Sequence, residues 1–145
     1  MPFTPAEILA VMEEDVPFNR YLGIRGESAE KGKSVLVLPV RPEFVGDPRR
    51  PALHGGVISS LIDTAGGLAA WSALEEGESV STVDLTVDYL EPGGLGADLR
   101  ASAELLRKGN RVCHVRMRVT QAGVLLAEGR GVYNIHRDRH PGPNP

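Results

Sequence analysis

The chain has 145 residues, 41% of them apolar and 24% charged, which is an ordinary composition for one globular domain. Its net charge of −3 argues against a general nucleic-acid binder, because such proteins are usually basic. The one cysteine, Cys113, cannot form an internal disulfide, and no segment approaches the roughly 20 apolar residues of a membrane-spanning helix. We therefore expect a cytoplasmic protein that binds neither nucleic acid nor membrane.

The first predicted element is a short amphipathic helix that runs from residue 5 to about residue 15. Thr4 can cap its first turn, a proline follows at the first helical position, and Glu7 lies three residues after Thr4, as in a capping box. We expect Phe18 and Leu22 to pack this helix against the rest of the protein.

Two strands are predicted next. Residues 23–29 and 33–40 alternate with a period of two around a turn at residues 30–32. Residues 41–53 contain three prolines and are predicted to form a loop.

A long helix is predicted from His54 to Leu74, with apolar or small side chains on nearly all of its surface. A helix of this kind is buried on nearly all sides. Four glycines lie in or beside it: Gly55, Gly56, Gly66 and Gly67. Glycine inside a helix costs about 1 kcal/mol relative to alanine, so these glycines are expected where another backbone or a ligand comes close.

The last part of the chain predicts four strands, over residues 82–89, 100–105, 113–119 and 124–135. The turns between them, at residues 92–94, 109–110 and 122–123, are each short enough for a hairpin. This order of elements predicts an α+β fold, in which one antiparallel sheet wraps around a central helix over about residues 55–75. We expect a single domain over residues 1–136 and a disordered tail over residues 137–145.

Asp63 lies two turns into the most apolar helix of the chain. An ionised carboxylate is rarely buried without a partner, because its desolvation costs several kcal/mol. Its helix neighbours at i−4, i+3 and i+4 are Ser59, Gly66 and Gly67, so no cation is available locally. Either a serine or a backbone amide of another element binds this carboxylate, or the small residues leave space for a substrate and Asp63 is catalytic.

His54, Gly55 and Gly56 form the start of this helix, where the first N–H groups have no intrahelical acceptor and the helix dipole favours negative charge. Two glycines let a ligand carbonyl approach these amides, which favours an oxyanion hole. The alternative is a glycine turn that only fits the helix under the sheet. We expect His54 to support the helix start by hydrogen bonding rather than to act as an acid or base.

The spacing of Gly55 and Asp63 has a consequence for assembly. The two residues are eight positions apart, or roughly 12 Å along a helix at about 1.5 Å per residue. Reacting groups must approach to about 3 Å, so one subunit cannot bring both residues to one carbonyl carbon. If both act, Asp63 of one chain faces Gly55 of another across a two-fold axis, which predicts a dimer.

Three segments carry a resemblance to a known family: LHGGVISSLIDTAGGLA, STVDLTVDYLEP and LLRKGNRVCHVRMRV. They resemble the hot-dog-fold thioesterases of the phenylacetate-degradation and Arthrobacter-type 4-hydroxybenzoyl-CoA group, over nearly the whole domain. The resemblance implies the hot-dog fold, a homodimer or homotetramer, and hydrolysis of acyl-coenzyme A. It also places the family's catalytic acid at Asp63, its carbonyl-binding amide at Gly55 and a water-positioning hydroxyl at Thr82.

The sequence departs from the family pattern at two positions. Family members carry Asn or Gln about six residues ahead of the HGG histidine, where this chain has Pro48 with Asp47 beside it. Either Asp47 takes over the role of that amide or the role is unfilled. Some members carry Ser or Thr four residues after the acid, where this chain has Gly67.

Several cations are candidates for binding the phosphates of coenzyme A, because Arg and Lys suit a phosphorylated ligand. Three lie near the predicted turn at residues 109–110, namely Arg107, Lys108 and Arg111. Two more, Arg49 and Arg50, lie in the predicted loop over residues 41–53. The alternative for the first three is a solvated hairpin tip. No set of metal ligands with credible spacing occurs, and no cofactor is expected, since coenzyme A is part of the substrate.

Two functions stay open on the sequence, and a third is disfavoured. The first is hydrolysis of an aryl- or short- to medium-chain acyl-CoA, with Asp63 as general base toward water or as nucleophile. Gly66 and Gly67 leave room for either kind of acyl group. The second is a non-catalytic protein that binds acyl-CoA or a small aromatic ligand on the same fold. An enoyl-CoA hydratase is disfavoured, because the Asp and His pair of those enzymes does not occur at helix spacing.

Overall fold

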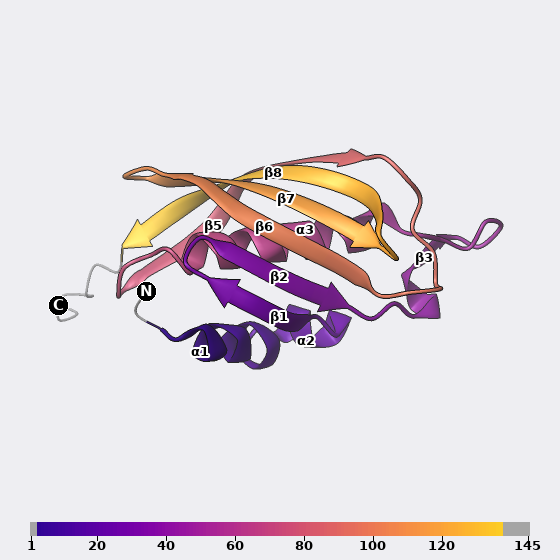
Figure 1. Ribbon diagram of the computed structural model, residues 1–145, viewed down its shortest axis with the longest axis horizontal. Helices are drawn as coiled ribbons and strands as arrows, with labels where there is room; N and C mark the ends of the chain where they lie inside the picture. Colours follow the sequence, from indigo (N-terminus) through magenta and orange to yellow (C-terminus); the bar gives the residue numbers. More distant parts are fainter. Residues whose placement is uncertain (1–2, 138–145) are drawn as a thin grey trace, which may run out of the picture.

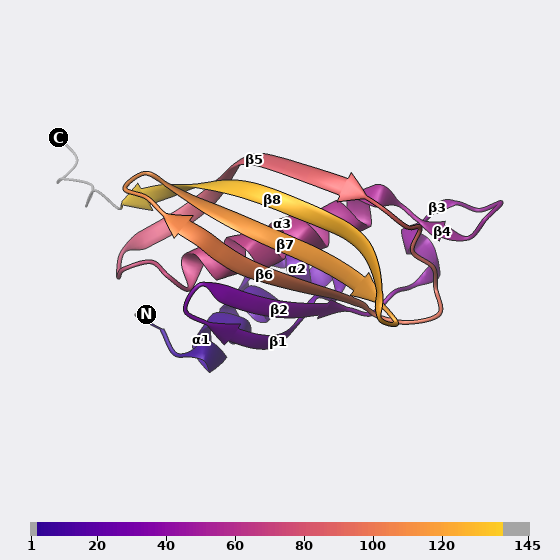
Figure 2. The same cartoon turned by 45° about the horizontal axis from the view of Figure 1, so that its top comes forward.

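In the computed structural model, which describes residues 3–137, an antiparallel sheet of six strands curves around one long helix, α3 (Gly55–Trp71) (Figure 1). The strands follow in this order across the sheet: β1 (Arg25–Glu30), β2 (Lys33–Leu38), β6 (Leu99–Lys108), β7 (Val112–Gln121), β8 (Val124–Arg137) and β5 (Glu78–Tyr89). Figure 2 shows α3 running beneath the strands. The predicted α+β hot-dog architecture is thereby confirmed.

The core lies between α3 and the inner face of the sheet. On α3 the residues Leu61, Ile62, Ala65 and Ala69 are fully buried. The largest fully buried side chains of the central strands are Leu36, Leu38, Leu99, Val115, Met117, Val119 and Tyr133. Cys113 on β7 is also fully buried, and burial raises the pKa of its thiol.

The N-terminal region differs from the single helix that the sequence predicts. The capping box is present, since Thr4 Oγ1 accepts from the Glu7 amide at 3.2 Å and the Glu7 carboxylate accepts from the Thr4 amide at 2.7 Å. Helix α1 (Pro5–Ala10) then continues as a π-helix, η1 (Val11–Asp15), and a separate helix α2 (Pro17–Leu22) follows.

Helix α2 corrects one packing prediction. Leu22 is buried as expected, but Phe18 is 54% exposed, because α2 turns Asn19 and Leu22 inward and Phe18 to the other side. Gly23 ends the helix with φ +84°, a left-handed conformation that glycine adopts without strain. The first strand therefore starts at Arg25 rather than at residue 23.

The region between β2 and α3 is more ordered than the predicted loop. It contains a short helix, η2 (Pro42–Phe44), and a hairpin of β3 (Val45–Asp47) and β4 (Ala52–Leu53). Gly46 of this hairpin lies so close to His54 that an added Cβ would be 2.8 Å from the His54 Cα. The hairpin thus packs on the start of α3, as Figure 1 shows.

The predicted hairpin at residues 92–94 is wrong. Strands β5 and β6 do not pair, because β5 lies at the sheet edge beside β8 whereas β6 lies between β2 and β7. The connecting segment is held by other strands, since the Leu90 amide donates to Leu126 O at 2.8 Å and Gly93 O accepts from the Leu53 amide at 2.9 Å. The turns at residues 109–110 and 122–123 do form hairpins.

Strand β8 extends two residues past its predicted end. Arg137, assigned from the sequence to a disordered tail, pairs with Glu78 of β5 in the sheet and donates to its carboxylate at 3.1 Å. Residues 138–145 of the predicted tail lie outside the described residues. None of the described helices is long and apolar enough to span a membrane.

Candidate active site

His54 caps α3 with its side chain. Its Nδ1 accepts a 2.8 Å hydrogen bond from the Gly56 amide, which satisfies one of the free N–H groups of the first turn. The Gly56 amide is therefore engaged by the imidazole and is not free to bind a ligand carbonyl. Among the described residues no acceptor is found for the Gly55 amide, so this donor is the free one at the helix start.

The carbonyl side of Gly55 is bound by β5. The Tyr89 hydroxyl donates to Gly55 O at 2.8 Å, and a Cβ added at Gly55 would be 3.3 Å from the Tyr89 ring. A hollow of about 370 Å³ opens here, lined among others by Leu53, Ile58 and Pro92. Gly55 therefore lies on the wall of this hollow, and a side chain at position 55 would crowd the Tyr89 ring.

Asp63 is half-buried at mid-length of α3, facing β5 and β8. Its Oδ1 accepts a 2.8 Å hydrogen bond from the Thr82 hydroxyl and a 3.3 Å hydrogen bond from the Tyr133 hydroxyl. No residue in the range 3–137 donates to Oδ2. The structure thus brings Asp63 and Thr82 together, and it leaves one carboxylate oxygen open.

Tyr133 was missed by sequence reasoning. It lies on β8 directly opposite Thr82 of β5, 70 residues after Asp63, and its side chain is only 1% exposed. A tyrosine at an alternating position of a strand is typical of the core, so the neighbouring sequence does not predict its contact with Asp63. Two glycines packed against its ring, Gly66 and Gly131, are the only trace of it in the sequence.

An apolar groove of about 370 Å³ runs along α3 from Thr64 toward the C-terminal end of the helix. The helix contributes Thr64, Gly67, Leu68 and Trp71, which are spaced to share one face. The opposite wall consists of η1, the start of α2 and the start of β5: Val11, Met12, Val16, Asn19, Ser79 and Val80. Trp71, the last residue of α3, lines the groove at that end and packs against Phe3 with ring centroids 5.4 Å apart.

Asp47 binds two neighbouring arginines rather than pointing free into a site. Its Oδ1 accepts from the Arg49 side chain at 3.1 Å, and its Oδ2 accepts from Arg50 at 3.3 Å. The Arg49 guanidinium is the main reason that the pKa of the Asp47 carboxyl lies below its usual value. Both arginine side chains are more than 80% exposed at the tip of the β3–β4 hairpin.

The three cations near the β6–β7 turn have different environments. Lys108 donates to Ala73 O at 3.2 Å and pairs with Glu78 at 3.5 Å, so it joins the end of α3 to β5. Arg107 and Arg111 are exposed. The structure therefore places the turn near the C-terminal end of α3, with two arginines open to a ligand.

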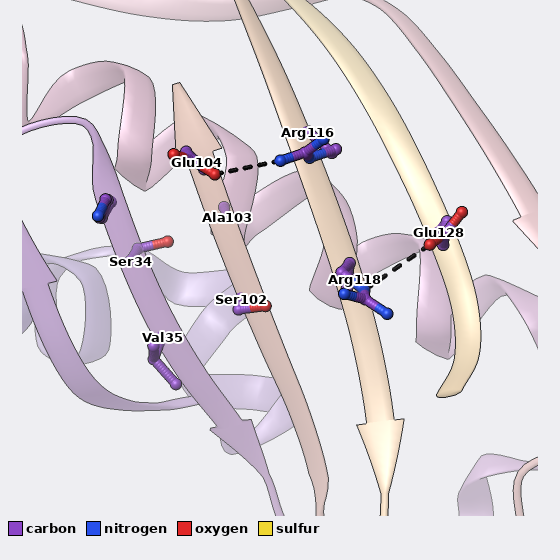
Figure 3. A pocket seen from close by; sticks show the side chains of 9 residues that line it. Ser34, Val35, Ser102, Ala103, Glu104, Arg116, Arg118 and Glu128 are labelled. Atoms are coloured by element: carbon purple, nitrogen blue, oxygen red, sulfur yellow. Dashed lines mark hydrogen bonds and ion pairs between the residues drawn. The ribbon is translucent and has the colours of Figure 1, made fainter. Parts of the chain in front are cut away.

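A second hollow, of about 460 Å³, lies on the outer face of the sheet, which is turned away from α3 (Figure 3). Arg116 pairs there with Glu104 at 3.3 Å and Arg118 with Glu128 at 3.7 Å, so neighbouring carboxylates neutralise both guanidinium groups. Asp63 of α3 lies on the opposite side of the sheet. We therefore place the candidate active site on the helix side of the sheet.

An antiparallel sheet wrapped around a central helix that carries a carboxylate at mid-length is the arrangement of the hot-dog class. A family model described as the thioesterase superfamily matches residues 51–128, which is more than half of the chain. The chain therefore belongs to the thioesterase superfamily.

Individual relatives agree with this assignment. The chain is 39% identical to the medium/long-chain acyl-CoA thioesterase YigI of Escherichia coli, over 83% of this chain and 86% of YigI. It is 30% identical to human acyl-coenzyme A thioesterase 13, over 86% of this chain and 89% of that protein. The structure of the E. coli PaaI protein from the phenylacetic acid degradation operon is similar with a TM-score of 0.81, at 26% identity and 92% coverage of both chains.

Proposed function

We propose that this protein hydrolyses acyl-coenzyme A thioesters at a site shared by two subunits, with Asp63 of one chain facing Gly55 of the other. The observation that carries the proposal is the pair of open groups on α3, namely Oδ2 of Asp63 and the Gly55 amide. Both lie on one helix, roughly 12 Å apart at about 1.5 Å per residue, so one thioester needs one of them from each subunit.

The outer edge of β5 supports such an assembly. This strand ends the sheet, is 12 residues long and has no neighbour beyond it in residues 3–137. Val83, Tyr89 and Leu90 along this edge are between 52% and 63% exposed. Long apolar edges are usually covered, because their free backbone groups pair with other strands. A second copy paired antiparallel through β5 would extend the sheet and bring the two α3 helices side by side.

The chemistry follows from the free groups. The Gly55 amide donates to the thioester carbonyl oxygen and stabilises the negative charge that develops there. Asp63 either takes a proton from water, whose oxygen then attacks the carbonyl carbon, or attacks that carbon itself to give a mixed anhydride that water hydrolyses. In both routes the carbon–sulfur bond breaks and coenzyme A leaves as a thiolate that then takes up a proton. Thr82 holds the carboxylate or positions the water.

The apolar groove that begins at Thr64, the residue after Asp63, supports a medium- to long-chain acyl group as the substrate. Its walls are apolar side chains, and Thr64 to Trp71 covers roughly 10 Å of helix at about 1.5 Å per residue. Gly67 lines the groove and keeps the helix surface low there, whereas Gly66 is buried against the Tyr133 hydroxyl and does not line the groove. The name of YigI, a medium/long-chain thioesterase, agrees with this choice.

Coenzyme A itself is the proposed partner of the exposed arginines. In antiparallel helices the C-terminal end of one α3 lies near the N-terminal end of the other, so Arg107 and Arg111 of one chain would approach the Gly55 site of its partner. Arg49 and Arg50 lie at the exposed tip of the β3–β4 hairpin, which precedes Gly55 in the same chain, and both bind Asp47. Lys108 is held by Glu78 and contributes to this cluster through its charge.

The decisive experiment mixes two inactive variants. Asp63→Asn removes the carboxylate. Gly55→Pro removes the amide donor at the first helical position, where the backbone accepts proline once the Tyr89 ring, 3.3 Å from an added Cβ, shifts slightly. His54 already has the extended backbone that precedes a proline. Each variant alone is expected to lose at least two orders of magnitude in thiol release from acyl-CoA. Equal amounts, unfolded and refolded together, should recover about a quarter of wild-type activity, since half the dimers are mixed and carry one intact site.

The outcomes separate the candidate functions. No recovery in the mixture would place both residues in one subunit and contradict the shared site. Full activity of folded Asp63→Asn would contradict the role of the carboxylate. Wild-type protein that binds acyl-CoA in calorimetry, yet releases no thiol from any chain length, would favour the non-catalytic ligand-binding protein instead.

A further inference from the structure

Two hydroxyl groups converge on one oxygen of Asp63. Thr82 and Tyr133 are paired across β5 and β8, and their hydroxyls lie 2.8 and 3.3 Å from Oδ1. The Tyr133 hydroxyl has one hydrogen and shares it between Oδ1 and the main-chain oxygen of Asp63, which is the nearer acceptor at 3.0 Å. It thus bridges the backbone and the side chain of the same residue, which restrains the rotation of the carboxylate.

Tyr133 occupies a slot that two glycines create. A Cβ added at Gly66 of α3 would overlap the Tyr133 hydroxyl, and a Cβ added at Gly131 would lie 2.5 Å from its ring. Gly67, the next residue on the helix, has only an ordinary contact of 3.6 Å to that ring. The slot is therefore specific to the position that brings the phenol to Asp63.

The phenol acts as a hydrogen-bond donor throughout the pH range of an enzyme assay. Burial first, and then the charge of Asp63, raises the pKa of Tyr133 well above its usual value. Its proton is consequently not available for transfer to water at neutral pH. This leaves a role in holding Asp63 rather than in proton exchange.

We propose that Tyr133 is the positioning residue of the active site, which holds Oδ1 of Asp63 so that Oδ2 is the oxygen that reacts. The inference rests on the thioesterase function proposed above. Thr82 shares the task, and the two hydroxyls together define which lone pairs of the carboxylate stay free.

The test is Tyr133→Phe, which deletes the hydroxyl and keeps the ring in its slot. With acyl-CoA as substrate, kcat should fall about 10- to 100-fold while KM changes less than about threefold, because the groups that bind substrate are untouched. Tyr21→Phe deletes the same hydroxyl at a residue of α2 that is 71% exposed and lines neither the groove nor the hollow at Gly55, and it should leave both constants unchanged.

Two combined variants distinguish positioning from general stability. Thr82→Ala with Tyr133→Phe should lose less than the product of the two single losses, because both hydroxyls act on one oxygen. Adding Tyr133→Phe to Asp63→Asn should leave the residual rate unchanged, because the phenol acts through the carboxylate. A phenol that only supports the fold would lower the residual rate further.

The inference is overturned if folded Tyr133→Phe keeps the full kcat, if the loss lies in KM, or if the two hydroxyl deletions multiply. These results differ from failure of the proposed function. In that case the wild type itself releases no thiol, or Asp63→Asn keeps full turnover.

Discussion

The hydroxyl of Thr82 lies 2.8 Å from Oδ1 of Asp63, which joins the sheet edge to the middle of the central helix. Neither residue is fully buried, and both border the strand edge that a second subunit would cover. The Thr82 hydroxyl binds one oxygen of the carboxylate and leaves the other oxygen free to react. The contact therefore orients Asp63 and does not block it.

Thr82→Val is expected to lower kcat roughly tenfold, the effect of about 1.4 kcal/mol on the barrier, because Asp63 loses its shorter hydroxyl contact. Thr82→Ser keeps the hydroxyl and should retain most of the activity. Ser81→Ala is the matched control, since the neighbouring Ser81 hydroxyl contacts His136 at 2.6 Å instead. Thiol release under steady-state conditions measures all three, and equal rates for Thr82→Val and wild type would refute the prediction.

The slot for Tyr133 predicts opposite effects of two adjacent substitutions. Gly66→Ala should destabilise the protein by about 1–3 kcal/mol, because the new methyl group overlaps the phenol in a filled core. Gly67→Ala meets only an ordinary 3.6 Å contact and should stabilise it by up to about 1 kcal/mol, since alanine is the better helix former. Urea unfolding compares the two variants. The same sign of change for both would contradict the slot.

Glu78 predicts a pH dependence of stability. Its carboxylate accepts from the Glu75 amide at 2.9 Å and pairs with Lys108 and Arg137, and these contacts, the amide first, lower its pKa in the folded protein. A lowered folded pKa means that the stabilisation is present above the unfolded value, about 4.3, and is lost as the pH falls through the folded value.

Glu78→Gln should therefore lower the urea midpoint at pH 7 and approach the wild type near pH 3. Glu76→Gln, an exposed neighbour, should follow the wild-type curve throughout. If Glu78→Gln kept the full pH dependence of the wild type, the ion pairs would not be its source.

The cap at the start of α3 predicts a stability effect at His54. His54→Ala should cost about 1 kcal/mol, because the Gly56 amide loses its acceptor, whereas His54→Asn supplies another capping oxygen and should restore most of it. Thermal unfolding followed by circular dichroism measures the difference. An alanine variant as stable as the wild type would show that water replaces the imidazole at no cost.

The Phe3–Trp71 pair predicts the limit on acyl-chain length. Trp71→Ala should open the far end of the groove and raise kcat/KM for longer chains by about fourfold per methylene newly buried. Rates for a series from octanoyl- to palmitoyl-CoA give the answer, and Trp71→Phe serves as the control that keeps the groove closed. An unchanged chain-length profile would place the acyl group elsewhere.

Local patterns were sufficient for most of the fold. The capping box at Thr4, the alternation in β6 and β7 and the apolar surface of α3 depend on near neighbours in the sequence, and each was predicted. The crossover at residues 90–98 could not be predicted, because a turn signal at residues 92–94 does not reveal which strand lies at the sheet edge.

The candidate site was predictable only where its residues stand out among their near neighbours in the sequence. Asp63 stands out as a charge in an apolar helix, and Gly55 as a glycine at a helix start. Tyr133 lies 70 residues beyond Asp63, and its contact depends on the register of β8, which one sequence does not specify. Residues contributed by a distant strand are found only once the strands are placed.

The buried thiol of Cys113 can serve as a probe of whether the protein is folded. As the one cysteine of the chain, it is sealed inside the sheet and resists ionisation, so intact molecules should not consume a thiol reagent. Coenzyme A released by turnover can then be titrated without background from the catalyst. A slow reaction of the thiol reagent in the absence of substrate would measure the fraction of molecules that have unfolded.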